Sequence, residues 1–228
     1  MHYLTDWLSS FFEIIHNGII SVIPNEGIAY GLAIVIFTII VRLILLPLNM
    51  KQMKSTAKMG ELQPQVKKLQ DKYKNDPQKA QQEMMKLYKE YGVSPLSGCL
   101  PLLIQMPILF GLYYVFQSLP NIKGVYFLWF DLGGSPVLKG DATTIIVSLI
   151  LPLIMAVTQY LSAISMSMNN GDEAQAKQAK MMNIFMTVFM IWISFKFTNA
   201  LILYWVVFNL FQVVQSYVMK FNEKRNNA

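Results

Sequence analysis

The chain has 228 residues, of which 54% are hydrophobic and only 14% are charged, with a formal net charge of +6. A soluble domain usually carries about a quarter of its residues as charged side chains, whereas this chain contains several apolar runs of about 20 residues, enough to cross a bilayer core of roughly 30 Å. One cysteine excludes an internal disulfide, and two histidines near the N-terminus argue against a metal cluster or a histidine-based triad. We therefore predict an all-α polytopic membrane protein that needs no cofactor.

Residues 1–23 are predicted to form an amphipathic helix that lies at the membrane interface. Apolar side chains recur there at three- and four-residue steps, and the acidic side chains lie off that stripe. A cleaved signal peptide is the rival interpretation, but the segment lacks a basic leading region and contains acidic residues. The apolar stripe consists of Leu4, Trp7, Leu8, Phe11, Phe12, Ile15 and Ile19.

Five transmembrane helices are predicted beyond a break that begins at Pro24. The last apolar run would be about 58 Å long as a single helix, which is too long for one crossing, so we divide it near Lys196 and Thr198. The predicted spans are residues 24–50, 96–119, 143–168, 181–195 and 198–219, joined by an extracellular loop at 120–142 and a cytosolic loop at 169–180 and followed by a cytosolic tail at 220–228.

Basic residues set the predicted orientation of the chain in the membrane. Fifteen of the 19 lysines and arginines lie in residues 51–95, in the loop at 169–180 and in the tail from residue 220. We therefore expect these segments to be cytosolic, with the N-terminus outside the cell and the C-terminus inside.

Residues 51–95 are predicted to form a cytosolic helical hairpin between the first two spans. One helix is expected from Lys51 to Lys74 and the other from Gln78 to Glu90, because Asn75-Asp76-Pro77 is a strong turn and helix-start signal. Pro64 is expected to bend or restart the first helix. The alternative is a solvated basic loop attracted to anionic lipid.

Arg42 is the most informative single residue in the chain. It lies about 12 Å from the cytosolic end of the first predicted span, where an arginine costs about 2.5–3.5 kcal/mol to insert. Apart from Glu26 at the outer end of the first span, about 24 Å from Arg42 along the helix, no aspartate or glutamate falls within the five predicted spans to pair with it. The sequence therefore indicates that water reaches Arg42 inside the membrane.

Polar residues on the other spans are expected to face the same water-filled cavity, because unpartnered polar groups are costly in lipid. The alternative is that these amides and hydroxyls only hold helices together. The predicted lining residues are Thr38, Arg42, Asn49, Gln105, Gln159, Asn183, Trp205, Asn209 and Gln212.

A water-filled cavity around Arg42 is also compatible with two other functional classes, a channel or transporter and an intramembrane enzyme. An anion-binding channel or transporter would use Arg42, but the fourth span is short and the chain shows no acidic ring and no inverted repeat. An intramembrane enzyme would lack a base in the spans, which leaves Cys99 as a weak candidate nucleophile.

Three stretches resemble the YidC/Oxa/Alb family of membrane protein insertases. They are Arg42-Leu43 with Pro47-Leu48, the segment GVSPLSGCLPLLIQMPILFGLYYV at 92–115, and Leu203 to Val207 with Asn209-Leu210-Phe211. The resemblance implies a five-helix core whose positively charged groove opens to the cytosol and the bilayer but is closed outside. Arg42 matches the groove arginine, and Gln105 and Trp205 match polar and aromatic positions of the family.

The resemblance also implies the partners and the location of the protein. A short, Gram-positive-type member would be a monomer in the bacterial plasma membrane, in contact with membrane lipid. It would insert nascent membrane proteins alone or beside the Sec translocon and receive them from the ribosome and the signal recognition particle pathway. The residues selected for cytosolic recruitment are Glu61, Lys67, Lys68, Lys72 and Met84.

Overall fold

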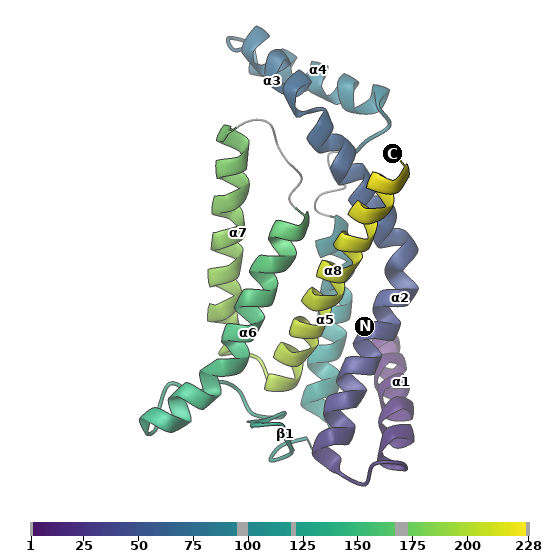
Figure 1. The fold of residues 1–228 in the computed structure, drawn as a ribbon, viewed down its shortest axis with the longest axis vertical. Helices are drawn as coiled ribbons and strands as arrows, with labels where there is room; N and C mark the ends of the chain where they lie inside the picture. Colours follow the sequence, from purple (N-terminus) through teal and green to yellow (C-terminus); the bar gives the residue numbers. More distant parts are fainter. Residues whose placement is uncertain (1, 95–99, 120–121, 167–172, 227–228) are drawn as a thin grey trace.

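The structure is a computed structural model that describes residues 2–94, 100–119, 122–166 and 173–226 (Figure 1). These residues form eight helices and one two-stranded antiparallel β-hairpin. The helices are α1 (His2–Ile20), α2 (Glu26–Glu61), α3 (Gln63–Lys72), α4 (Pro77–Glu90), α5 (Leu100–Ser118), α6 (Ala142–Met166), α7 (Glu173–Ser194) and α8 (Asn199–Asn226), and the strands are β1 (Tyr126–Phe127) and β2 (Phe130–Asp131).

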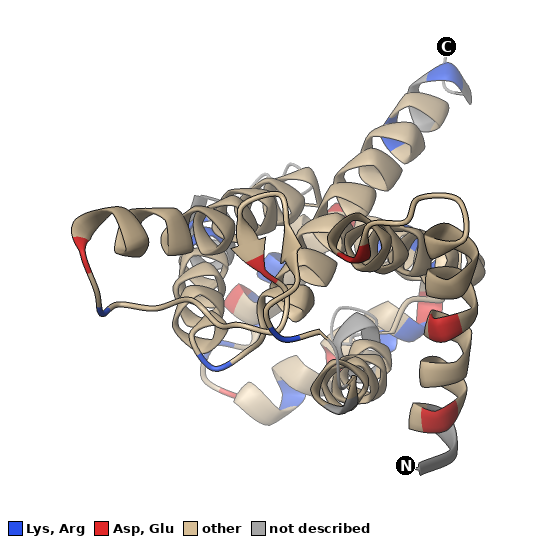
Figure 2. Cartoon of the chain, turned by 90° about the horizontal axis from the view of Figure 1, so that it is seen from below, with Lys and Arg blue, Asp and Glu red and all other residues tan. Residues whose placement is uncertain are grey.

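Helices α2, α5, α6 and α8 form the body of a bundle, and α7 lies alongside α6 (Figure 1). The α3–α4 helical hairpin and the C-terminus lie at one end of this bundle, which we call the hairpin end. The β-hairpin lies at the other end, which we call the loop end. Seen from the loop end, the ribbons of the bundle are mostly uncharged (Figure 2), as expected for helices in lipid.

Helix α2 is longer than the sequence pattern predicts. Asn25 caps its start by accepting a hydrogen bond of 3.0 Å from the Ile28 backbone N–H, and Pro47 does not end it. The helix runs on to Glu61 over a length of about 54 Å, so residues 51–61 extend the first predicted span and do not begin the helical hairpin. The helix expected from Lys51 to Lys74 is continuous with the span up to Glu61, and a separate helix, α3, begins at Gln63 beside Pro64.

The apolar stripe of α1 packs mainly on α2 and α5. Leu8 and Phe12 are buried there, while Trp7 stays exposed. Glycine and alanine on the partner helices allow the close approach: a Cβ at Gly111 would lie 2.4 Å from a Leu8 methyl group. The expectation that this stripe serves a lipid interface therefore needs correction, since most of it contributes to the protein core.

A folded loop covers the loop end of the bundle. Asp131 accepts backbone hydrogen bonds from Gly124 and Gly133, each 3.0 Å long, and its own carbonyl oxygen accepts one of 2.8 Å from the Asn199 side chain. Leu132 is fully buried in the core. The β-hairpin and the start of α8 are thereby fixed to each other.

The long apolar run in the C-terminal third is broken between Ser194 and Asn199, around the expected turn at Lys196. Helix α7 begins before the span predicted at 181–195, and α8 continues beyond residue 219. Within the described residues, α2, α6 and α8 are long and apolar enough to cross a membrane, and the apolar part of α7, Lys180–Ser194, is shorter. The count of five crossings stays a prediction.

Candidate functional site: a polar cavity around Arg42

Arg42 lies inside the bundle and is held by α8. Its side chain is only 5% exposed. One guanidinium nitrogen, Nη2, donates to the Phe208 carbonyl oxygen at 3.1 Å and to Gln212 Oε1 at 2.6 Å. The guanidinium carbon also lies 3.6 Å from the centroid of the Phe208 ring, and a desolvated contact of this kind contributes about 2 kcal/mol. Protein groups therefore hold the charge that the sequence analysis expected water alone to solvate.

A cavity of about 90 Å³ adjoins this arginine. That volume holds several water molecules, since each needs roughly 10–15 Å³. Four helices, α2, α5, α6 and α8, contribute to its wall. The lining residues are Arg42, Leu45, Asn49, Gln52, Met53, Thr56, Ile104, Gln105, Met166, Phe208, Gln212 and Gln215.

The cavity wall carries four buried nitrogen donors for which the described residues offer no partner. They are Arg42 Nε, Asn49 Nδ2, Gln52 Nε2 and Gln215 Nε2. A buried donor left without a partner costs about 1–3 kcal/mol, so each is expected to meet water or a ligand oxygen. Because all four are donors beside a positive charge, the cavity suits acceptors such as carboxylates and carbonyl oxygens.

Four of the nine predicted lining residues meet at this cavity: Arg42, Asn49, Gln105 and Gln212. The other five lie elsewhere. Trp205 donates from its indole N–H to Gln159 Oε1 at 3.0 Å, which joins α8 to α6 and matches the alternative of polar groups that hold helices together.

Thr38, Asn183 and Asn209 also need correction as lining residues. The Thr38 hydroxyl donates to the Ile34 carbonyl of its own helix at 2.6 Å, and the residue is fully buried. Asn183 belongs to α7, which packs mainly on α6 and supplies no residue to the wall. Asn209 is 2% exposed and does not line the cavity.

Sequence reasoning missed Gln52, Thr56 and Gln215. The signal was present: positions 42, 45, 49, 52 and 56 recur at three- and four-residue steps along one helix face. Ending the first span at residue 50 cut this face short. Gln215 likewise lies three residues beyond Gln212 on α8 and was passed over.

The cavity is closed toward the loop end. Gln105 Nε2 donates to the Tyr204 hydroxyl at 2.7 Å, and Tyr204 is 2% exposed. Phe37 and Leu201 are also buried in this core. This packed layer gives no support to a continuous pore through the described part of the bundle.

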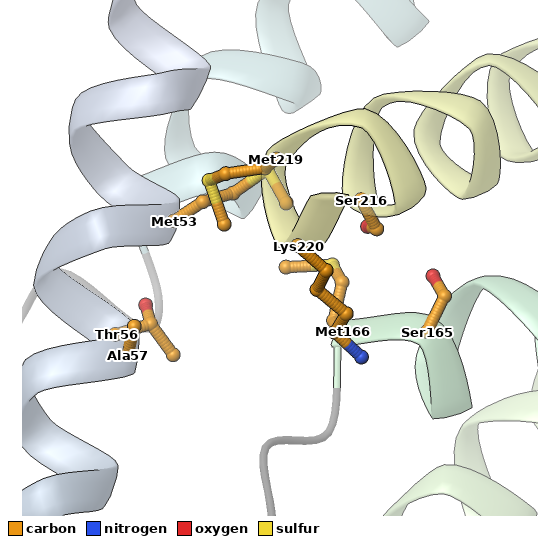
Figure 3. A pocket seen from close by; sticks show the side chains of 8 residues that line it. All are labelled: Met53, Thr56, Ala57, Ser165, Met166, Ser216, Met219 and Lys220. Carbon is orange, nitrogen blue, oxygen red and sulfur yellow. The ribbon is translucent and has the colours of Figure 1, made fainter. Parts of the chain in front are cut away.

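Toward the hairpin end, a narrower pocket of about 20 Å³ shares Met53, Thr56 and Met166 with the cavity. Figure 3 shows its side chains arriving from α2, α6 and α8, with Met219 beside Met53. Methionine is unbranched and flexible, and it adapts to irregular apolar partners. The cavity is therefore narrowed on this side by side chains that can move aside.

The residues selected for recruitment lie on or beside the helical hairpin. Glu61, Lys67, Lys68 and Lys72 are exposed. Met84 is half-buried, and its sulfur accepts a hydrogen bond of 3.6 Å from Gln70 of the facing helix. Cys99, the weak candidate nucleophile, lies outside the described residues.

These features define a helical membrane protein that holds a cationic, donor-rich cavity within its bundle. Residues 22–226 match the family model described as 60Kd inner membrane protein. The membrane protein insertase YidC of Clostridium tetani is 46% identical over all of this chain and 98% of the relative, and that of Clostridium perfringens is 48% identical over 94% and 88%. The chain therefore belongs to the YidC family of membrane protein insertases, which is not a family of catalytic enzymes.

A solved structure supports the same assignment. The active YidC insertase crystal structure with its first transmembrane domain resolved is 32% identical, with a TM-score of 0.68. The match covers 94% of this chain and 46% of that one, so this chain corresponds to about half of the crystallised protein.

Proposed function

We propose that this chain inserts nascent membrane proteins into the bilayer, and that the cavity around Arg42 receives a polar segment of the inserting chain from the hairpin end. The observation that carries this proposal is the group of four buried donors that find no partner among the described residues, beside a fixed positive charge. A polar and often acidic segment brings the carboxylate and carbonyl oxygens that these donors lack. Pairing with them lowers the cost of taking the segment out of water.

The cavity has to widen to do this. Its volume of about 90 Å³ is below the roughly 300–1,000 Å³ of ordinary ligand sites. The narrow pocket between Met53, Met166 and Met219 is the natural point of access, because methionine side chains change rotamer readily. The inserting chain displaces these side chains and the water behind them.

Release into lipid is proposed to occur between α5 and α6. Helix α5 packs mainly on α1, α2 and α8, and α6 packs on α7 and α8. Among the described residues, α5 and α6 therefore make little contact with each other. An apolar segment can leave through that seam while the polar segment stays near Arg42.

The proposal extends to partners and orientation. The exposed lysines of α3 provide a basic surface for the ribosome, and the signal recognition particle pathway and the Sec translocon are the proposed sources of substrate. The chain acts as a monomer in the bacterial plasma membrane, crossing it five times, with its hairpin end in the cytosol and its N-terminus outside.

The test compares Arg42→Ala and Arg42→Lys with the wild type in lipid vesicles. A single-span substrate with an acidic N-terminal tail is synthesised in a cell-free system, and protease protection measures the translocated tail. We expect Arg42→Ala to lower protection at least about tenfold, equivalent to about 1.4 kcal/mol. Arg42→Lys keeps the charge but loses the planar fork, so part of the activity should remain.

Lys51→Gln is the matched control, because it removes one positive charge from an exposed position on the same helix. It should insert the substrate as well as the wild type does. Equal protection with the wild type and Arg42→Ala would refute the electrostatic role of Arg42. Photocrosslinking from Gln52 to a stalled substrate supplies a second readout, and crosslinks found only from Lys123, at the loop end, would contradict the proposed site.

A further inference from the structure

A second cavity lies on the outer side of the bundle, between α2 and α8. It has a volume of about 520 Å³, within the range of ordinary ligand sites. We call it the α2–α8 groove. Its lining residues are Leu46, Met50, Lys54, Phe211, Val214, Gln215, Val218, Met219, Asn222 and Arg225.

Along both walls of this groove, the lining changes from apolar to polar and cationic side chains toward the C-terminal end of each helix. On α2, apolar Leu46 and Met50 precede Lys54 at four-residue steps, over about 12 Å. On α8, a comparable apolar stretch precedes Asn222 and Arg225. The two cationic side chains lie toward the hairpin end, where the C-terminal part of α8 carries basic segments (Figure 2). The groove is therefore apolar along its length and positively charged at one end.

Gln215, which also borders the cavity around Arg42, supplies a second sign that this groove takes a ligand. Its side chain is 8% exposed and lines the groove, yet its Nε2 has no hydrogen-bond partner among the described residues. Val214 and Val218 beside it are 62% and 55% exposed, so the groove opens to the outside of the bundle. A molecule seated there meets apolar walls, one buried amide donor and two cations.

We propose that the α2–α8 groove binds an anionic phospholipid of the cytosolic leaflet. An acyl chain lies along Met50, Phe211 and Val218, and the phosphate pairs with Lys54 and Arg225. An ester carbonyl of the same lipid accepts the Gln215 amide hydrogen that has no acceptor within the described part of the chain. Basic pockets between helices at this depth favour anionic headgroups, and each cation near the surface contributes about 1 kcal/mol.

This site differs in place and ligand from the cavity that receives the inserting chain, although Gln215 borders both. A lipid held here would also cover the outer side of the α2–α8 seam. Its binding is measurable without any insertion assay, so failure of this proposal and failure of the insertase mechanism are distinguishable.

The experiment uses the full chain purified from vesicles of equal parts phosphatidylglycerol and phosphatidylcholine, with retained lipid counted by native mass spectrometry. The wild type should retain phosphatidylglycerol in preference to phosphatidylcholine. The double variant Lys54→Gln/Arg225→Gln should retain at least about tenfold less phosphatidylglycerol. The control Lys51→Gln/Lys180→Gln removes two exposed charges outside the groove lining and should bind as the wild type does.

A second variant tests the apolar part of the site. Val218→Trp fills the groove from an exposed position, so the fold should tolerate it while the retained lipid is lost. Equal retention of the two lipids by the wild type would overturn the proposal. Undiminished phosphatidylglycerol in the Lys54/Arg225 variant, or undiminished lipid in Val218→Trp, would also overturn it.

Discussion

Gln212 joins three helices through a single amide. Its Oε1 accepts the 2.6 Å hydrogen bond from Arg42 of α2, and its Nε2 donates to the sulfur of Met166 on α6. The arginine that defines the cavity is thus held by a residue that also contacts the methionine at the narrow pocket. Displacement of Met166 by an inserting chain would therefore disturb Gln212 and, through it, the hydrogen bond to Arg42.

Gln212→Leu should destabilise the protein, because it removes one acceptor from a buried charge. A hydrogen bond to a charged group contributes about 1.5–3 kcal/mol, and thermal unfolding of the detergent-solubilised protein measures the loss. Gln212→Glu keeps an acceptor and adds a counter-charge, so its unfolding temperature should be at least as high as that of Gln212→Leu. Unchanged unfolding of Gln212→Leu would show that the Arg42 guanidinium finds an equivalent acceptor elsewhere.

Tyr204→Phe should also destabilise the protein, because it leaves the amide of Gln105 without its acceptor. The Tyr204 hydroxyl is buried and accepts a 2.7 Å hydrogen bond, and an unpaired buried donor costs about 1–3 kcal/mol. Adding Gln105→Leu should recover part of that stability, since it removes the orphaned donor. If the double variant unfolds at a lower temperature than both single variants, the unpaired Gln105 amide is not the cause of the destabilisation.

Gly27→Ala should destabilise the loop end strongly. A Cβ at Gly27 would lie 1.9 Å from the Tyr126 carbonyl oxygen, so α2 and β1 have to separate. Overpacking of this kind typically costs about 1–3 kcal/mol. Gly18→Ala is the control, because nothing lies within 4 Å of its Cβ position and α1 should gain about 0.5–1 kcal/mol of helix stability. Thermal unfolding and limited proteolysis of the 122–141 loop measure both variants. Gly27→Ala should lower the unfolding temperature and speed cleavage of the loop, whereas Gly18→Ala should raise the unfolding temperature slightly.

Asp131→Ala should open the folded loop, because Gly124 and Gly133 lose the carboxylate oxygen that accepts from both backbone N–H groups. Asp131→Asn retains a carbonyl acceptor at the same place and should be milder. Hydrogen exchange of residues 122–134 is the measurement, and faster exchange is expected in Asp131→Ala than in Asp131→Asn. Identical exchange in the two variants would mean that packing of Leu132 alone holds the loop.

Much of the helical architecture could be read from the sequence. Apolar runs of span length and the helix-start signal at Asp76 are local patterns, and the helices they predict occur in the structure. The length of α2 could not be read in this way. The Lys-rich segment that begins at residue 51 marks the end of the apolar span, but the helix continues through it to Glu61, because lysine is compatible with a helix and Pro47 removes only a single hydrogen bond.

The sequence by itself determined that the chain is a helical membrane protein with one deeply placed arginine, because hydrophobicity and charge are properties of local composition. It also marked Asn49, Gln105 and Gln212 as companions of that arginine, because polar side chains within apolar spans need partners. Only the tertiary structure decided which polar residues share a cavity and which pair with each other, as Trp205 does with Gln159. Those choices depend on how far each helix rotates against its neighbours, and that rotation is set by contacts between residues far apart in the chain.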